Sequence, residues 1–201
     1  MLTIEENGML SNDSTGVTRV IEKGFGGIEF PPDLAIKENT SCDILLIGLG
    51  PFFSKPICDV LHDKRANVNI LFTLDQDVVT TRGKSIKWEK STYTNIVHDD
   101  SYNFIVEYRD NPNIKYWLYK IFPFGLYLRV ENYCWFTPLW NTNYSEESNK
   151  VVEAGSAVFQ RTIEIKTDSY MGRMLDINYK FILKSAENMS AQDLEKSTCL
   201  P

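Results

Sequence analysis

The chain contains few residues of the types that carry out covalent or metal chemistry. Among its 201 residues there are two histidines and four cysteines, and no two cysteines form a C-x-x-C pair. A structural zinc site needs ligands at such close spacing. We therefore predict no metal site, no bound cofactor and no catalytic group of this kind. The cysteines are Cys42, Cys58, Cys134 and Cys199.

Two of these residues are the first candidates for a nucleophile or a general base. His62 lies among charged residues near the end of a predicted helix, where a cation interacts favourably with the helix dipole. Cys134 lies in an aromatic run that is predicted to be a strand, and a free cysteine there is typically a small buried hydrophobic residue. We assign neither residue a catalytic role.

A glycine pair, Gly48-x-Gly50, follows a predicted strand as a dinucleotide fingerprint would. The third glycine of that fingerprint is absent, because its position is Phe53. Asp75 does follow the second predicted strand, where the fingerprint places an acidic residue. A nucleotide-binding α/β domain that uses this turn remains an alternative interpretation.

Three carboxylates could together serve a metal-dependent nucleotide or phosphodiester hydrolase. They are Asp75, Asp77 and Glu131, and they are scattered in the sequence without a motif that links them. This second alternative requires the fold to bring them together around a divalent ion.

The predicted elements begin with a βαβ unit. The apolar runs 42–50 and 67–74 are predicted to be buried parallel strands, and residues 55–66 between them form a helix with Pro56 in its first turn. Asp75 can cap the mixed helical region 77–109 that follows.

Strands dominate the second half of the chain. Alternation within 125–131 directs Leu126, Leu128 and Val130 to one face, and Gly125, Tyr127, Arg129 and Glu131 to the other. Further strands are expected in 113–121, 133–140 and 157–166. A helix over 168–187 is predicted to begin at Asp168 or Ser169, with an apolar stripe of Tyr170, Met174, Ile177 and Phe181.

Together these elements predict a mixed α/β domain with a central mixed sheet flanked by helices. We expect one domain over residues 19–187, with flexible tails at 1–18 and 188–201. Formal net charge is −6, which disfavours nucleic-acid binding. No segment has the apolar length to span a membrane and no signal peptide is present, so we expect a cytoplasmic protein with free thiols.

The segment 122–143 is the densest apolar and aromatic stretch, and it resembles part of the phospholipase-D-like (HKD) superfamily. That family carries the signature H-x-K-x4-D, often preceded by Pro-Phe, as Pro123-Phe124 precede this segment. The signature's His, Lys and Asp positions are Gly125, Tyr127 and Asn132 here. The later Gly-Ser pair corresponds to Leu139-Trp140, and the Asn to Asn143. The resemblance covers about residues 20–187 and a single copy of the signature.

The departures from the signature determine the function that the resemblance implies. In the family the His is the nucleophile and the Lys neutralises phosphate charge, so Gly125 and Tyr127 imply a catalytically inactive member of a single-copy branch. Such a module is expected to act in ligand sensing or in dimerisation and assembly, in a regulatory or defence-associated role. The resemblance further implies a homodimer with the degenerate strands near its axis. A small phosphate-containing ligand or a partner protein would bind Tyr127, Arg129, Glu131, Asn132, Trp135, Trp140 and Asn143.

Overall fold

A parallel pair of strands forms the centre of the protein. The computed structural model describes residues 15–50, 53–85, 90–123, 125–139, 142–145, 150–153 and 161–198. β2 (Ser41–Leu45) and β3 (Asn67–Phe72) are joined by α1 (Lys55–His62), which has Pro56 in its first turn. β2 pairs with β3 in parallel along its whole length, which confirms the predicted βαβ unit.

The main sheet has eight strands in the order β1-β9-β6-β5-β2-β3-β4-β10. β4 continues the parallel part beside β3, while every other pairing in this sheet is antiparallel. The predicted mixed α/β class is therefore confirmed. The remaining strands of this sheet are β1 (Val17–Ile21), β4 (Ile114–Leu118), β5 (Gly125–Val130), β6 (Tyr133–Pro138), β9 (Thr162–Lys166) and β10 (Glu187–Met189).

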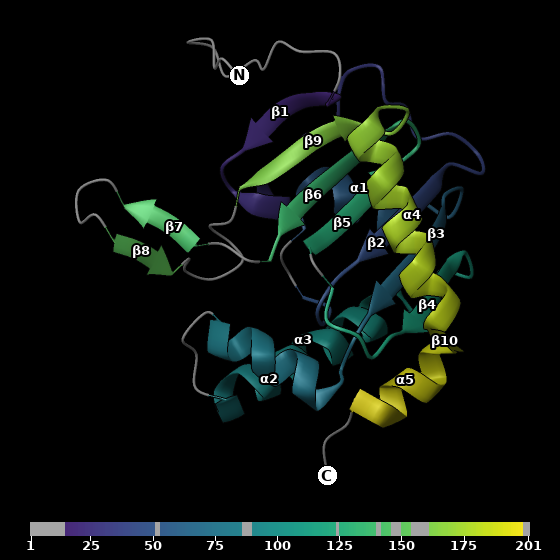
Figure 1. Ribbon diagram of the computed structural model, residues 1–201. Coiled ribbons are helices and arrows are strands. Elements are labelled where there is room, and N and C mark those ends of the chain that lie inside the picture. Colours follow the sequence, from purple (N-terminus) through teal and green to yellow (C-terminus); the bar gives the residue numbers. More distant parts are fainter. Residues whose placement is uncertain are drawn as a thin grey trace.

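Helices cover both faces of this sheet (Figure 1). One face packs against α1 and α3 (Lys90–Tyr108), and Ile44, Ile70 and Leu128 belong to that core. The other face packs against α4 (Tyr170–Ser185), and Leu45, Leu71 and Tyr127 belong to that second core. Side chains thus alternate between the two cores along each strand, as the sequence predicts for β5.

A further helix, a two-stranded hairpin and a 3-10 turn complete the part of the fold that precedes α4. α2 (Gln76–Ser85) packs beside α3, and its first turn is capped by Asp75, whose Oδ1 accepts from the amides of Asp77 and Val78. β7 (Thr142–Ser145) and β8 (Lys150–Glu153) pair with each other and form a separate hairpin (Figure 1). A 3-10 turn, η1 (Gly24–Gly27), follows β1.

The predicted burial of α4 is wrong. Ser169 caps the helix as expected, with its Oγ accepting from the Gly172 amide at 3.0 Å. The helix, however, buries Gly172, Leu175, Tyr179 and Ile182, and the four residues expected to face the core are exposed. Two series of apolar residues run along α4 at helical spacing. The series that packs on the sheet is the one that contains the small Gly172. A Cβ added there would lie 2.3 Å from the Lys166 carbonyl oxygen.

The chain beyond residue 187 also differs from expectation. In place of a flexible tail, β10 pairs with β4 and α5 (Ala191–Thr198) follows, with Leu194 fully buried in the core next to α1 and α3. A single leucine in a polar segment gave little sequence signal. Of the expected N-terminal tail, residues 1–14 lie outside the described residues, and β1 begins at Val17.

Candidate functional site

Gly125 and Tyr127, the predicted counterparts of the signature's His and Lys, share one face of β5. Tyr127 is only 2% exposed, because it packs beneath α4 with its ring centroid 5.5 Å from that of Tyr179. Burial raises the pKa of the Tyr127 hydroxyl well above its usual range, and the nearby Cys134 raises it further. The Tyr127 hydroxyl is therefore neutral at physiological pH.

Gly125 leaves no room for a side chain at this point of β5. A Cβ built there would lie 2.0 Å from Cε2 of Phe136 and 2.9 Å from the Thr137 carbonyl oxygen, both on the neighbouring strand β6. Distances under 3 Å are incompatible with van der Waals packing, so β6 occupies the space that a side chain at position 125 would need.

Arg129 lies two residues further along the same face and belongs to a partly buried ionic network. Its guanidinium donates to Oδ2 of Asp43 on β2 and, over 3.0 Å, to Oδ1 of Asp176 on α4. Asp43 also accepts from Tyr179 Oη at 3.2 Å and from Asn69 Nδ2 at 3.0 Å. The network joins β5, β2 and α4, and Lys180 adds a second cation by pairing with Asp176 at 2.6 Å.

Trp135, another predicted ligand contact, faces the opposite side of the sheet. It is fully buried, stacks on Phe30, and donates through Nε1 to Oε2 of Glu164 at 3.0 Å. The same carboxylate binds Arg19 at 2.8 Å. Neither Trp135 nor Tyr127 is therefore available at an interface in this structure.

Two of the remaining predicted contacts lie away from this cluster in the described structure. Glu131 and Asn132 form the exposed turn between β5 and β6, at the far end of the strand from Gly125. Glu131 has a positive φ of 50° there, and its Oε1 accepts from the Ser41 amide at 2.9 Å. Trp140 lies outside the described residues, and Asn143 belongs to the separate strand β7.

The Gly48–Gly50 turn has its first two amides already bonded within the protein. The Gly48 amide donates to the Thr73 carbonyl at 3.1 Å, and the Leu49 amide donates to Oγ of Ser101 at 2.8 Å. Gly48 has a φ of +70°, and a Cβ there would lie 2.5 Å from Val97 on α3. A phosphate-binding turn needs such amides free, so this geometry argues against the nucleotide-binding interpretation.

Two of the carboxylates proposed for a metal-dependent hydrolase lie at opposite ends of the parallel strands. Asp75 follows the carboxyl end of β3, whereas Glu131 bonds Ser41 at the opposite, amino end of β2. Six residues of strand extend about 20 Å, which no single ion can bridge. Among the described residues, no three His, Cys, Asp or Glu side chains converge as metal ligands would.

Within the described residues, two thiols and both imidazoles have environments that fit a structural or solvated role. Cys42 and Cys134 are buried, and burial raises the pKa of the Cys134 thiol to about 12. His62 is exposed at the end of α1, 3.6 Å from Glu107, as its position in the sequence predicts. His98 on α3 is half-buried, and burial lowers the pKa of its imidazole.

The surface feature that sequence reasoning missed is the outer face of α4. Tyr170, Met174, Ile177 and Phe181 are large and apolar, yet 49–67% exposed. The signal was present in the second apolar series of the helix, Gly172, Leu175, Tyr179 and Ile182, because one helix cannot bury both series in one sheet. No helix in the described part of the chain is long and apolar enough to cross a membrane.

Comparisons with known proteins give similarities of fold. No family model matches the sequence, and no curated protein does. Among solved structures, phosphatidylserine synthase from Haemophilus influenzae Rd KW20 matches 83% of this chain with a TM-score of 0.49 and 10% identity. The chain spans 37% of the length of that protein. Nuc, a phospholipase D family member from Salmonella typhimurium, matches 76% of this chain and 84% of its own, with a TM-score of 0.39 and 12% identity.

Proposed function

We propose that the chain is a phospholipase-D-like module that does not cleave phosphodiesters and that acts by assembly, as a homodimer. The observation that carries the first part is the packing at Gly125 and Tyr127. A side chain at Gly125 would collide with Phe136, and Tyr127 is sealed beneath α4. A nucleophile and a phosphate-binding cation have no place at these positions.

Assembly is better supported than ligand sensing. The residues expected to line a binding site are divided between the two faces and the far turn of the sheet, with Tyr127 and Trp135 in opposite cores. Where these residues form hydrogen bonds, their partners are other groups of the same chain. The four exposed apolar side chains on α4, by contrast, form a surface of the kind that proteins bury in interfaces.

The setting we propose for this module is a regulatory or defence-associated assembly in the cytoplasm. The three cysteines in the described part of the chain, Cys42, Cys58 and Cys134, are all free thiols, which fits a reducing compartment. The net charge of −6 supports a protein partner over nucleic acid.

The proposal is tested by an activity assay and a mass measurement on the same sample. We expect no hydrolysis of bis(p-nitrophenyl) phosphate above the buffer blank, with or without Mg²⁺ or Mn²⁺. We also expect light scattering to give a mass that rises from monomer to dimer with concentration. Turnover that is lost in Tyr127→Phe would refute the inactive assignment, and a monomeric mass at every concentration would refute assembly.

A further inference from the structure

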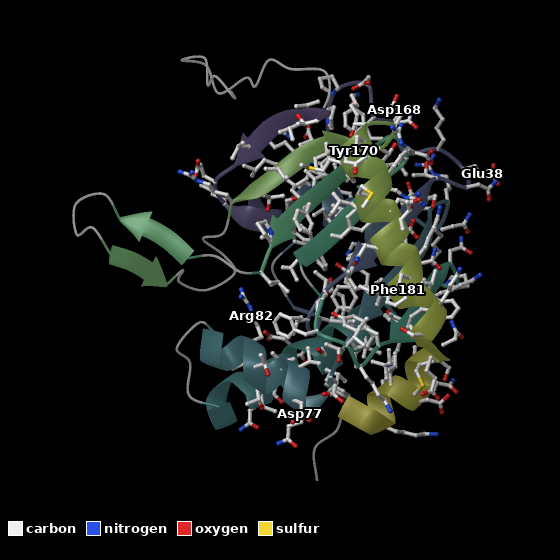
Figure 2. All side chains as sticks on the ribbon, in the orientation of Figure 1. Glu38, Asp77, Arg82, Asp168, Tyr170 and Phe181 are labelled. Carbon is white, nitrogen blue, oxygen red and sulfur yellow. The ribbon has the colours of Figure 1, made fainter. Side chains whose placement is uncertain are left out.

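The outer face of α4 carries apolar side chains in the pattern of a helix–helix seam. Tyr170, Met174, Ile177 and Phe181 are 67%, 49%, 60% and 66% exposed, and their spacings of four, three and four residues are those of alternating a and d positions in a coiled coil. Figure 2 shows Tyr170 near the beginning and Phe181 near the end of the helix. We call these four residues the α4 stripe.

We propose that the α4 stripe binds the same stripe of a second copy of this chain, with the two helices antiparallel about a two-fold axis between Met174 and Ile177. This inference rests on the proposed assembly function and names its surface. The stripe is symmetric about its own centre, with an aromatic residue at each end and an aliphatic residue on each side of the middle. An antiparallel pair places Tyr170 against Phe181 of the second copy and Met174 against its Ile177, as a self-complementary interface requires.

Charges at the two ends of the helix select the antiparallel arrangement. Asp168 is exposed just before α4, and Lys184 is exposed in its last turn. Neither side chain has an ion-pair partner within the described structure. An antiparallel pair brings each Lys184 to Asp168 of the second copy, whereas a parallel pair would oppose like charges at both ends. The same register places Arg173 opposite Asn178 and Lys180 opposite Met171, so no like charges meet.

The size of the stripe indicates a weak and reversible dimer. Four large side chains, each removing roughly 100–150 Å² from water, bury on the order of 500 Å² per copy, which is less than the roughly 800 Å² per partner of a standard interface. We therefore expect a dissociation constant on the order of 10 µM, within reach of sedimentation equilibrium.

The direct test places a charge at the centre of the stripe. Ile177→Glu puts a carboxylate against Met174 of the second copy at two symmetric places, and we expect the dissociation constant to rise at least about tenfold. The matched control is Tyr102→Glu, which places the same charge at an exposed aromatic residue of α3, on the opposite face of the sheet. We expect this control to dimerise as wild type does.

A charge exchange tests the direction of the helices without touching the apolar residues. Asp168→Lys alone places like charges at each end of the antiparallel pair, and we expect the dissociation constant to rise several-fold. Combining it with Lys184→Asp restores opposite charges and should return the constant to near the wild-type value. Circular dichroism establishes that each variant is folded. If Ile177→Glu does not fold, the two charge variants still test whether the α4 stripe forms the interface.

The possible outcomes separate this inference from the function on which it rests. A wild-type protein that stays monomeric overturns both the α4 inference and the proposed assembly function. The same conclusion holds if the protein dimerises only after residues 1–14 are removed. Two other outcomes overturn only the α4 geometry. In the first, the Ile177→Glu variant dimerises as wild type does. In the second, the variant with both Asp168→Lys and Lys184→Asp dimerises no more tightly than Asp168→Lys alone.

Discussion

Arg129 on β5 donates to Asp176 on α4 over 3.0 Å, and this bond is one of the polar connections between α4 and the sheet. The same guanidinium binds Asp43, whose side chain is only 5% exposed. Burial alone would lower the pKa of Arg129, but the two carboxylates and Tyr127 outweigh it and raise this pKa. The charge of Arg129 thus neutralises one buried and one partly buried carboxylate.

Removal of this arginine is expected to be strongly destabilising. Arg129→Met leaves Asp43 as a buried charge without its cation, and breaking a buried pair in this way costs about 3 kcal/mol of unfolding free energy. Urea denaturation measures this loss. The control is Lys55→Met, which breaks the exposed Lys55–Asp59 pair on α1 and should cost much less, because water screens an exposed pair. Equal losses in the two variants would show that the network contributes no more than a surface pair.

Gly125 gives a prediction about packing between β5 and β6. Gly125→Ala places a methyl group 2.0 Å from Phe136, and the overpacking should cost about 1–3 kcal/mol. Phe136→Leu removes the ring atoms that collide, so the double variant should be less destabilised than the sum of the two single variants. Strictly additive losses, measured by urea denaturation, would place the conflict at the Thr137 carbonyl and not at the ring.

The thiols give a prediction about chemical reactivity. At pH 8 a thiol with a pKa of about 12, such as Cys134, has on the order of 10³-fold less thiolate than an unperturbed cysteine. We expect iodoacetamide to modify Cys58, which is half-buried, while Cys42 and Cys134 stay unmodified in the folded protein. Peptide mapping by mass spectrometry identifies the sites, and labelling in guanidinium is the control. Rapid labelling of Cys134 would contradict its burial beneath α4.

The sequence was sufficient for the parts of the fold that depend on local pattern. The βαβ unit, the alternation of β5 and the start of α4 at Ser169 were all predicted, because apolar periodicity and capping residues are properties of short segments. The position of Leu194 in the core was not predictable in this way, because a single buried residue in a polar segment depends on a contact distant in the sequence.

The candidate site was less predictable, since it depends on which partner each side chain meets. Alternation placed Tyr127 and Arg129 on one face, but it did not show that α4 covers that face with Leu175 and Tyr179. Asp43, in the middle of an apolar run, was the signal of a buried ion pair that sequence reasoning did not use. Trp135 and Tyr127 lie on opposite faces of the sheet because, in the β5–β6 hairpin, Trp135 pairs with Leu128 and not with Tyr127.

His98 gives a prediction about stability and pH. Its imidazole Nδ1 is buried and has no hydrogen-bond partner among the described residues, and burial lowers its pKa in the folded state below the usual 6.5. As pH falls below about 6.5 the unfolded chain therefore takes up a proton before the folded protein does, and stability is lost. Above that pH the contribution is fully present.

A variant that cannot titrate isolates this effect. His98→Gln should lose less unfolding free energy than wild type between pH 7.5 and 5.5, as followed by urea denaturation at each pH. Nearby Asp100 has a pKa raised by burial and by Asp99, so its protonation favours the folded state as pH falls and acts in the opposite direction. Asp100→Asn should accordingly steepen the loss at low pH while His98→Gln flattens it. Parallel curves for wild type and His98→Gln would mean that the imidazole is solvated in the folded protein.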